Sequence, residues 1–231
     1  MRASSGVPGF DNLVGGGFPE NRLYVVSGPP GSGKTTFCAQ FAAQGARNGE
    51  DVLYVSMHET KEGIRRDMSG YEFGFDRALD TDRVTFLDSF SSDGRRFFGL
   101  PGERRDRSGV TNRLTGFINS RDIDRVVFDS TMLLRFLLDD DEDTMIQLLS
   151  SLKRTDATTL LISEMTDPSA YSEEHYLAHG VVFMHNYLED DGMQRGIQVL
   201  KMRGTDVNTD IQDIEFTDGG LRVGSATTVT H

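Results

Sequence analysis

The chain contains no tryptophan, one cysteine and four lysines among its 231 residues. With Cys38 as the sole cysteine, a disulfide within the chain is excluded, and a reducing compartment such as the cytoplasm is expected. The first ten residues hold no apolar stretch of signal-peptide length. The longest apolar region, residues 126–138, is interrupted by Asp129 and Arg135, so we expect no membrane-spanning helix.

Basic residues are also in short supply. There are 36 acidic residues against 24 basic ones, for a net charge of −12, and most of the bases are arginine. A carboxylate-rich surface suits concentrated salt, where repulsion between like charges is screened within about 3 Å at 1 M. The composition therefore predicts a salt-rich cytoplasm, such as that of a halophilic archaeon, with an ordinary acidic protein as the plainer alternative. The acidity also argues against strong binding to nucleic acid.

The order of apolar patterns predicts one α/β domain over residues 1–231, a length that suits such a domain. Strand-like runs alternate with helical ones, which favours a mostly parallel sheet with helices on both faces. No helical pattern separates the last strands, so we expect an antiparallel extension from residue 180 onward. The expected strands are residues 22–27, 51–57, 83–89, 124–129, 158–163, 180–184 and 196–203, and the expected helices are 35–47 and 142–153.

Two segments lack such patterns. Residues 1–21, rich in glycine, form an expected lead-in to the first core strand, and residues 91–109 an expected flexible insertion. The insertion interleaves arginines with Phe97 and Phe98, a composition that can bind single-stranded nucleic acid. Its acidic residues dilute the charge, so a flexible loop or a subunit contact is favoured over a nucleic-acid site.

A phosphate-binding motif follows the first core strand. Residues 28–35, GPPGSGKT, match the pattern G-x-x-x-x-G-K-[ST] between a predicted strand and a predicted helix. The glycines let backbone N–H groups turn inward, Lys34 reaches the β- and γ-phosphates, and the Thr35 hydroxyl ligates Mg²⁺. A glycine-rich turn without a ligand is the alternative. The predicted nucleotide-binding residues are Pro30, Gly31, Ser32, Gly33, Lys34, Thr35 and Thr36.

Acids at the ends of three later strands complete the expected site, because ligands bind at the carboxyl edge of such sheets. Asp129 ends an apolar strand and is the expected second metal residue beside Thr35. Glu59 follows the strand 51–57 and is the candidate general base for hydrolysis. Glu164 follows the strand 158–163, where a γ-phosphate sensor is one interpretation and a structural acid the favoured one.

With these motifs in place, the sequence resembles the KaiC branch of the RecA-like ATPases over nearly its whole length. The resemblance implies a RecA-like fold that binds ATP between the subunits of a ring, commonly a hexamer. The chain carries one such domain, whereas the clock protein of that family has two in tandem. The motifs that carry the resemblance are Gly9-Phe10-Asp11, Gly15-Gly16-Gly17-Phe18-Pro19, the 28–35 motif, His58-Glu59-Thr60, Asp129-Ser130, His185-Asn186 and Leu200-Lys201-Met202-Arg203-Gly204-Thr205.

The resemblance also implies a catalytic role for two cations near the end of the chain. In that family, the residues at the positions of Lys201 and Arg203 act on the γ-phosphate of a neighbouring subunit's ATP. They are two residues apart on a predicted strand, so both side chains project from one face, while Leu200 and Met202 are expected to face the core. An arginine finger supplied by a neighbour uses such a pair. Two exposed charges on a surface strand are the alternative.

One departure from the family pattern bears on hydrolysis. The family usually has two adjacent glutamates where this chain has His58-Glu59, so Glu59 is the one acid left. Our first hypothesis is an ATP-dependent regulator that hydrolyses ATP slowly and signals its state to a protein partner. A DNA-dependent recombinase-type ATPase is the second hypothesis. A nucleotide-dependent scaffold that does not hydrolyse ATP, suggested by His58, is the third.

Overall fold

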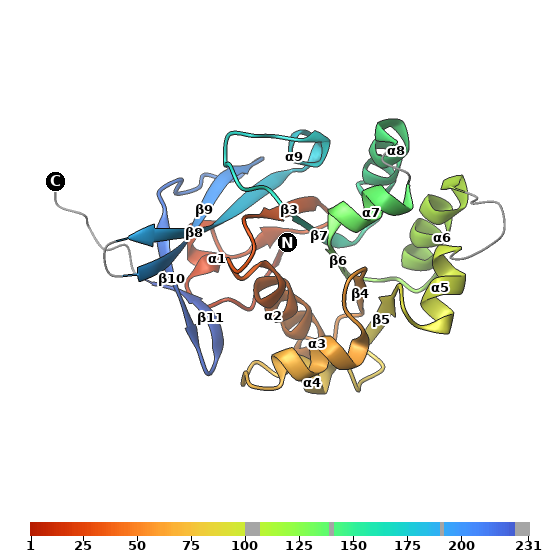
Figure 1. Cartoon of the computed structure of the whole chain (residues 1–231), viewed down its shortest axis with the longest axis horizontal. Helices are drawn as coiled ribbons and strands as arrows, with labels where there is room; N and C mark the ends of the chain where they lie inside the picture. Colours follow the sequence, from red (N-terminus) through yellow and green to blue (C-terminus); the bar gives the residue numbers. More distant parts are fainter. Residues whose placement is uncertain (100–106, 139–140, 190–191, 225–231) are drawn as a thin grey trace.

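The fold is built around one large sheet in the computed structural model, which describes residues 1–99, 107–138, 141–189 and 192–224. Among these residues, nine strands form a sheet in the order β11-β10-β9-β8-β3-β7-β6-β4-β5 (Figure 1). The strands from β8 to β5 in this order run parallel. Their bounds are β3 Leu23–Ser27, β4 Val52–Ser56, β5 Val84–Asp88, β6 Arg125–Asp129, β7 Thr158–Ser163 and β8 Gly180–Glu189.

The central strands are buried along their whole length. Every residue of β3, β4, β6 and β7 is buried, as expected for parallel strands covered on both faces. Each of these strands lies within two residues of the predicted bounds. The α/β class and the mostly parallel sheet are therefore confirmed.

The antiparallel part begins one strand later than predicted. β8 pairs with β3 in parallel, and the antiparallel pairs run from β8 through β9 (Gly192–Met202) and β10 (Gln212–Thr217) to β11 (Gly220–Val223). Between β7 and β8 lies the short helix α9 (Glu173–Leu177), which supplies the crossover that a parallel pair requires. A helix of five residues is too short to show a helical pattern in sequence.

Helices cover both faces of the sheet, and the sheet separates two hydrophobic cores. α2 (Lys34–Arg47), α3 (Lys61–Met68) and α4 (Phe75–Ala78) place apolar side chains in the first core. The second core takes residues from α5 (Ser92–Phe98), α6 (Arg107–Ser120), α7 (Thr131–Leu137) and α8 (Glu142–Leu152). Figure 1 shows α2, α3 and α4 below the sheet and α6, α7 and α8 beside its other face.

The lead-in segment packs on α2. It contains β1 (Arg2–Ala3), α1 (Phe10–Leu13) and β2 (Phe18–Pro19), with β1 and β2 paired. Phe10 and Phe18 lie edge-on against Phe37 of α2, at centroid distances of 5.0 and 6.3 Å. The segment expected to be irregular therefore holds short elements fixed by aromatic packing.

The predicted flexible insertion at 91–109 needs correction at both ends. Residues Ser92–Phe98 form α5, and α6 begins at Arg107, while residues 100–106 lie outside the described part of the chain. Phe98 is buried, and Phe97 packs edge-on against Phe117 of α6 at 5.8 Å. These rings belong to the second core, so they are not presented for stacking on nucleic-acid bases.

Within the described ranges, none of the helices has the length and apolar character needed to cross a membrane.

Candidate nucleotide site

The predicted phosphate cradle connects β3 to α2 at the carboxyl edge of the sheet. Gly31 and Gly33 have φ values of 76° and 102°, a region that side chains with a Cβ rarely adopt. The loop can therefore fold around the start of α2, whose N-terminal N–H groups favour an anion. The sequence motif and its expected strand–loop–helix context coincide in the structure.

Lys34 is held inside this loop. Its Nζ donates hydrogen bonds to the carbonyls of Gly28 at 2.7 Å and Pro29 at 2.9 Å. The same atom lies 3.5 Å from a carboxylate oxygen of Glu164, which follows β7. Burial lowers the pKa of Lys34, and the Glu164 carboxylate opposes that shift. The ammonium group therefore stands between the loop and an acid from the neighbouring strand.

Asp129, at the end of β6, is the most buried acid of the site, with 1% of its surface exposed. Its carboxylate accepts a hydrogen bond from the Tyr54 hydroxyl at 3.2 Å, and the Thr35 hydroxyl lies near enough to lower the pKa of Asp129. His58 Nε2 lies 3.6 Å from its other oxygen. Burial raises the pKa of Asp129, while His58 and the two hydroxyls oppose the shift. Thr35 and Asp129, the two predicted metal residues, are thus brought together.

The side chains at this point suit a magnesium ion better than a softer metal. A threonine hydroxyl and a carboxylate are hard oxygen donors, and Mg²⁺ is commonly held by one or two such groups together with phosphates and water. Among the described residues, no group of three or more His, Cys, Asp or Glu side chains forms a metal cluster. A metal bound here would therefore take most of its ligands from a nucleotide and from water.

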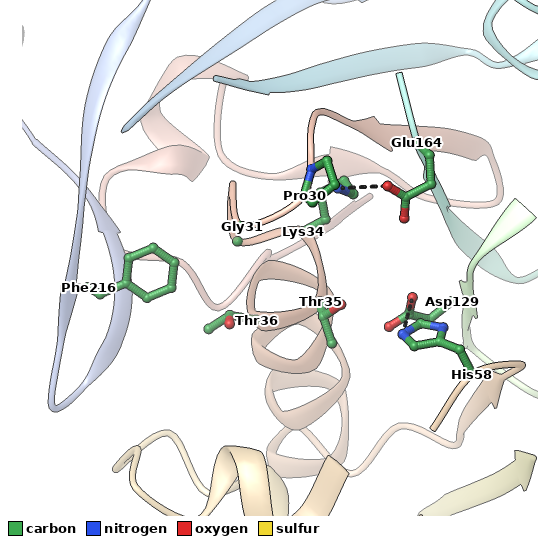
Figure 2. Close-up of a pocket in the computed structure, with 10 residues that line it drawn as sticks. Pro30, Gly31, Lys34, Thr35, Thr36, His58, Asp129, Glu164 and Phe216 are labelled. Carbon is green, nitrogen blue, oxygen red and sulfur yellow. Dashed lines mark ion pairs between the residues drawn. The ribbon is translucent and has the colours of Figure 1, made fainter. Parts of the chain in front are cut away.

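These residues line a pocket of about 420 Å³. In Figure 2, Glu164, Asp129 and His58 lie on one side of the phosphate loop, and Phe216 lies on the other. The sheet order explains the arrangement, because β7, β6 and β4 lie on one side of β3, and β10 lies on the other. The lining residues are Pro30, Gly31, Gly33, Lys34, Thr35, Thr36, His58, Asp129, Glu164 and Phe216.

Glu59, the predicted general base, does not line this pocket. A Cβ placed on Gly63 would clash with Glu59 Oε2, so the carboxylate rests against the first turn of α3. Negative charge is stabilised at that end of a helix. His58, the residue that departs from the family pattern, lines the pocket instead.

Lys201 and Arg203 are also absent from the pocket lining of their own chain. Lys201 Nζ donates to the carbonyls of His175 at 2.7 Å and Tyr176 at 3.2 Å, and Arg203 donates to Tyr176 at 3.3 Å. Both cations therefore point to the same side, toward α9, as their spacing predicts. Burial, and then the neighbouring Arg203, lower the pKa of Lys201.

A register irregularity lies beside Leu200 and Met202, the two apolar residues on either side of Lys201. The pairing of β8 with β9 shifts between Val181 and Val182, which face Lys201 and Val199. With the extra residue of this bulge, Leu200 packs against the second core and Met202 lies in the first. Both contact a core, as predicted, but from opposite faces of the sheet.

Buried hydrogen bonds connect α9 to the nucleotide site. His175 Nε2 lies 2.7 Å from Ser27 Oγ, the side chain that directly precedes the phosphate loop. Ser163, directly before Glu164, donates to Glu174 at 2.9 Å. α9, whose carbonyls accept hydrogen bonds from Lys201 and Arg203, is thus fixed to β3 and β7, the strands that end directly before the phosphate loop and before Glu164.

Phe216 was not expected from the sequence, because β10 was not among the predicted strands. A sequence signal for β10 is present: Ile214 and Phe216 alternate with acids, and Asp218-Gly219-Gly220 follows as a turn.

Glu164, for which the structural role was favoured, does line the pocket and pairs with Lys34. Ser32, predicted to bind the nucleotide, is buried and outside the pocket lining.

Comparison with known proteins gives consistent matches. The chain matches the family described as "ATPase: KaiC" over residues 3–228. It is 29% identical over 212 residues to the circadian clock protein KaiC3 of Synechocystis sp., which covers 89% of this chain and 42% of that protein. It is 30% identical over 214 residues to the circadian clock oscillator protein KaiC of Prochlorococcus marinus, again covering 89% and 42%. The chain therefore spans about two fifths of the length of these relatives.

A solved structure agrees in fold over nearly the whole chain. The KaiC-like protein of the hyperthermophilic archaeon Pyrococcus horikoshii OT3 has a TM-score of 0.82 and 28% identity to this chain, and the match covers 97% of this chain and 99% of that one. The predicted RecA-like α/β fold is confirmed by this match.

Proposed function

The chain belongs to the KaiC family of ATPases, and from this membership we propose that it binds Mg-ATP, hydrolyses it slowly and reports its nucleotide state to a protein partner. The observation that carries the proposal is the meeting of Lys34, Thr35 and Asp129 in one pocket at the carboxyl edge of the sheet. A cation for phosphate and two hard oxygen donors for a metal are what a phosphate loop of this kind uses.

The residues divide the work of binding. The N–H groups of the glycine loop and Lys34 would bind the β- and γ-phosphates, while Thr35 and Asp129 would hold Mg²⁺, in part through water. When bound, Mg²⁺ supplies neutralisation of the charge on the phosphates. Glu164, at 3.5 Å from Lys34, orients that ammonium group across the pocket.

Hydrolysis requires a group that orients or deprotonates water, and Glu59 is our candidate. Its carboxylate rests on α3, while His58 lines the pocket, so Glu59 would have to turn toward the γ-phosphate to act. This position supports slow turnover. It equally supports the second candidate function, a nucleotide-dependent scaffold without hydrolysis.

We further propose that the protein acts as a ring, with each pocket completed by a neighbour. Lys201 of β9 and Arg203, which directly follows this strand, both point toward α9 and stand outside the pocket of their own chain, which fits a pair that acts on a neighbour's ATP. Sedimentation with and without ATP tests whether the protein forms a ring.

The acidic composition supports a salt-rich cytoplasm as the setting.

Release of phosphate from ATP in molar KCl tests the chemistry. We expect slow release by the wild-type chain and none by Lys34→Ala, because the cradle loses its cation. Glu59→Gln should lower turnover by about a hundredfold, the usual scale for a general base, while ATP still binds. Glu62→Gln is the matched control, because this acid lies on α3 with 74% of its side chain exposed.

The remaining outcomes separate the alternatives. Tight ATP binding without any turnover would replace the ATPase proposal by the scaffold. Turnover that rises when single-stranded DNA is added would favour the recombinase-type function.

A further inference from the structure

Phe216 lies at the end of the pocket away from the acids. Of the described residues that line the pocket, it alone carries a benzene ring. Its exposed fraction is 36%, whereas Phe10, Phe18, Phe37 and Phe41 are fully buried in the first core. A partly exposed aromatic ring at the edge of a polar pocket provides apolar surface on which a ligand can pack.

The ring is fixed in place against the phosphate loop. A Cβ built on Gly33 would lie 2.7 Å from Phe216 Cζ, so the tip of the ring touches the loop itself. The guanidinium of Arg195 of β9 lies over the ring, 5.1 Å from its centroid, and Arg195 Nε donates a hydrogen bond to the Gly31 carbonyl at 3.0 Å. A ring held in this way loses little conformational entropy when a ligand packs on it.

The two ends of the pocket define a direction for a bound nucleotide. Lys34, Thr35 and Asp129 mark the end where the β- and γ-phosphates and the metal would lie. The α-phosphate and the nucleoside must then extend away from Asp129, past Thr36. In Figure 2, Thr36 lies between Thr35 and Phe216, so this path leads to the ring.

We propose that Phe216 is the platform on which the purine base of a nucleoside triphosphate stacks, with Arg195 positioning the ring. This inference rests on the proposed function, because it takes the direction of the nucleotide from the phosphate and metal residues. Stacking uses the π-face that every base presents, so Phe216 contributes affinity for the base without distinguishing adenine from guanine.

Calorimetric titration with three magnesium-saturated probes tests the platform: ATP, GTP and inorganic tripolyphosphate. For Phe216→Ala we expect the Kd of ATP and of GTP to rise at least about fivefold, since stacking on one aromatic side chain is commonly worth that much or more. The Kd of tripolyphosphate, which has no base, should stay within twofold. Phe216→Tyr should keep the wild-type affinity for all three probes.

The control variant is Phe90→Ala, an equally drastic truncation of a phenylalanine that is 52% exposed and does not line the pocket. It should change none of the three affinities. Thermal unfolding of each variant verifies that the fold is retained.

Two results would overturn the proposal. An unchanged Kd for ATP in Phe216→Ala would show that the base lies elsewhere. An equal loss of ATP and tripolyphosphate affinity would show that the ring supports the loop and not the base. If the wild-type chain binds neither ATP nor tripolyphosphate, the proposed function itself fails, and this result is distinct from the other two.

Discussion

His175 is buried with 2% of its surface exposed, and both of its ring nitrogens have partners. Nδ1 accepts a hydrogen bond from the Ser172 N–H at 3.1 Å, which places the proton of the neutral ring on Nε2. Nε2 then donates to Ser27 Oγ at 2.7 Å. Protonation of Nδ1 would remove the acceptor that caps α9. The neutral imidazole is therefore part of the structure that supports the phosphate loop.

We predict that protonation of His175 destabilises the fold. Burial lowers its pKa, Glu174 opposes the shift, and Lys201 and Arg135 add to it. The unfolded chain thus binds this proton more tightly than the folded chain. The free energy of unfolding should fall as the pH drops below about 6.5, the ordinary histidine value, toward the lowered folded pKa. Urea unfolding between pH 7.5 and 5.5 measures the slope.

The variant His175→Gln isolates the contribution of this ring, because glutamine cannot titrate. Burial also lowers the pKa values of His179 and His185, so the free energy of unfolding of both proteins should still fall somewhat at low pH. We expect the variant to be less stable at pH 7.5 but to lose less stability on acidification. Parallel pH curves for the two proteins would refute the prediction.

At the scale of secondary-structure elements, α9 and β9 form a unit. The last carbonyls of α9 accept hydrogen bonds from Lys201 and Arg203, which matches the preference of helix C-termini for positive charge. If these cations act on a neighbour's ATP, they must exchange carbonyl partners for phosphate oxygens. Moving these cations from carbonyl to phosphate oxygens would favour association of subunits when the neighbour's site holds a highly charged nucleotide such as ATP.

This exchange predicts an ATP-dependent assembly that the paired variant Lys201→Ala/Arg203→Ala weakens. Sedimentation velocity in molar KCl should show a ring in the presence of ATP and a smaller species without it. In the paired variant, the ring should be reduced or absent. Arg83→Ala is the control, because Arg83 pairs with Asp51 on the surface. A wild-type monomer under both conditions would exclude a role for these cations in a neighbouring subunit.

The elements that sequence predicts well are those with one dominant local signal. Fully buried strands such as β3 and β6 are continuous apolar runs, and α2 and α8 have a clear helical stripe. β10 and α9 lack a dominant signal. Only two of the six residues of β10 are buried, so the alternation at Ile214 and Phe216 is a weak cue, and α9 is only five residues long. The parallel pairing of β8 with β3 depends on contacts 156 residues apart, such as Tyr24 with Gly180. Local patterns cannot report such pairing.

The site follows the same division. Lys34, Thr35 and Asp129 are predictable because a motif and a strand end place them. The choice between His58 and Glu59 is made by α3, whose first turn attracts the Glu59 carboxylate. Phe216 comes from β10, a strand far along the chain that reaches the site by pairing with β9. Tertiary packing therefore determines that His58 and not Glu59 lines the pocket, and that Phe216 lies beside the loop.

At the scale of the whole molecule, charge sets the conditions under which the fold is stable. With a net charge of −12, carboxylates repel one another in dilute buffer. We predict that the urea midpoint of unfolding rises between 10 mM and 1 M KCl, where the screening length falls from about 30 Å to about 3 Å. Sucrose at matched osmolality is the control for non-electrostatic effects. An unchanged midpoint would contradict adaptation to salt.

The position of β3 in the sheet also determines when the nucleotide site is made. Its two neighbours in the described sheet are β7 and β8, which begin at Thr158 and Gly180. The strand that leads into the phosphate loop thus leaves the ribosome long before either of its partners. Such distant pairing makes folding slow, since a long loop must close before any contact stabilises it. A chain that ends before residue 158 contains the complete phosphate-loop motif but neither strand that holds it in the sheet.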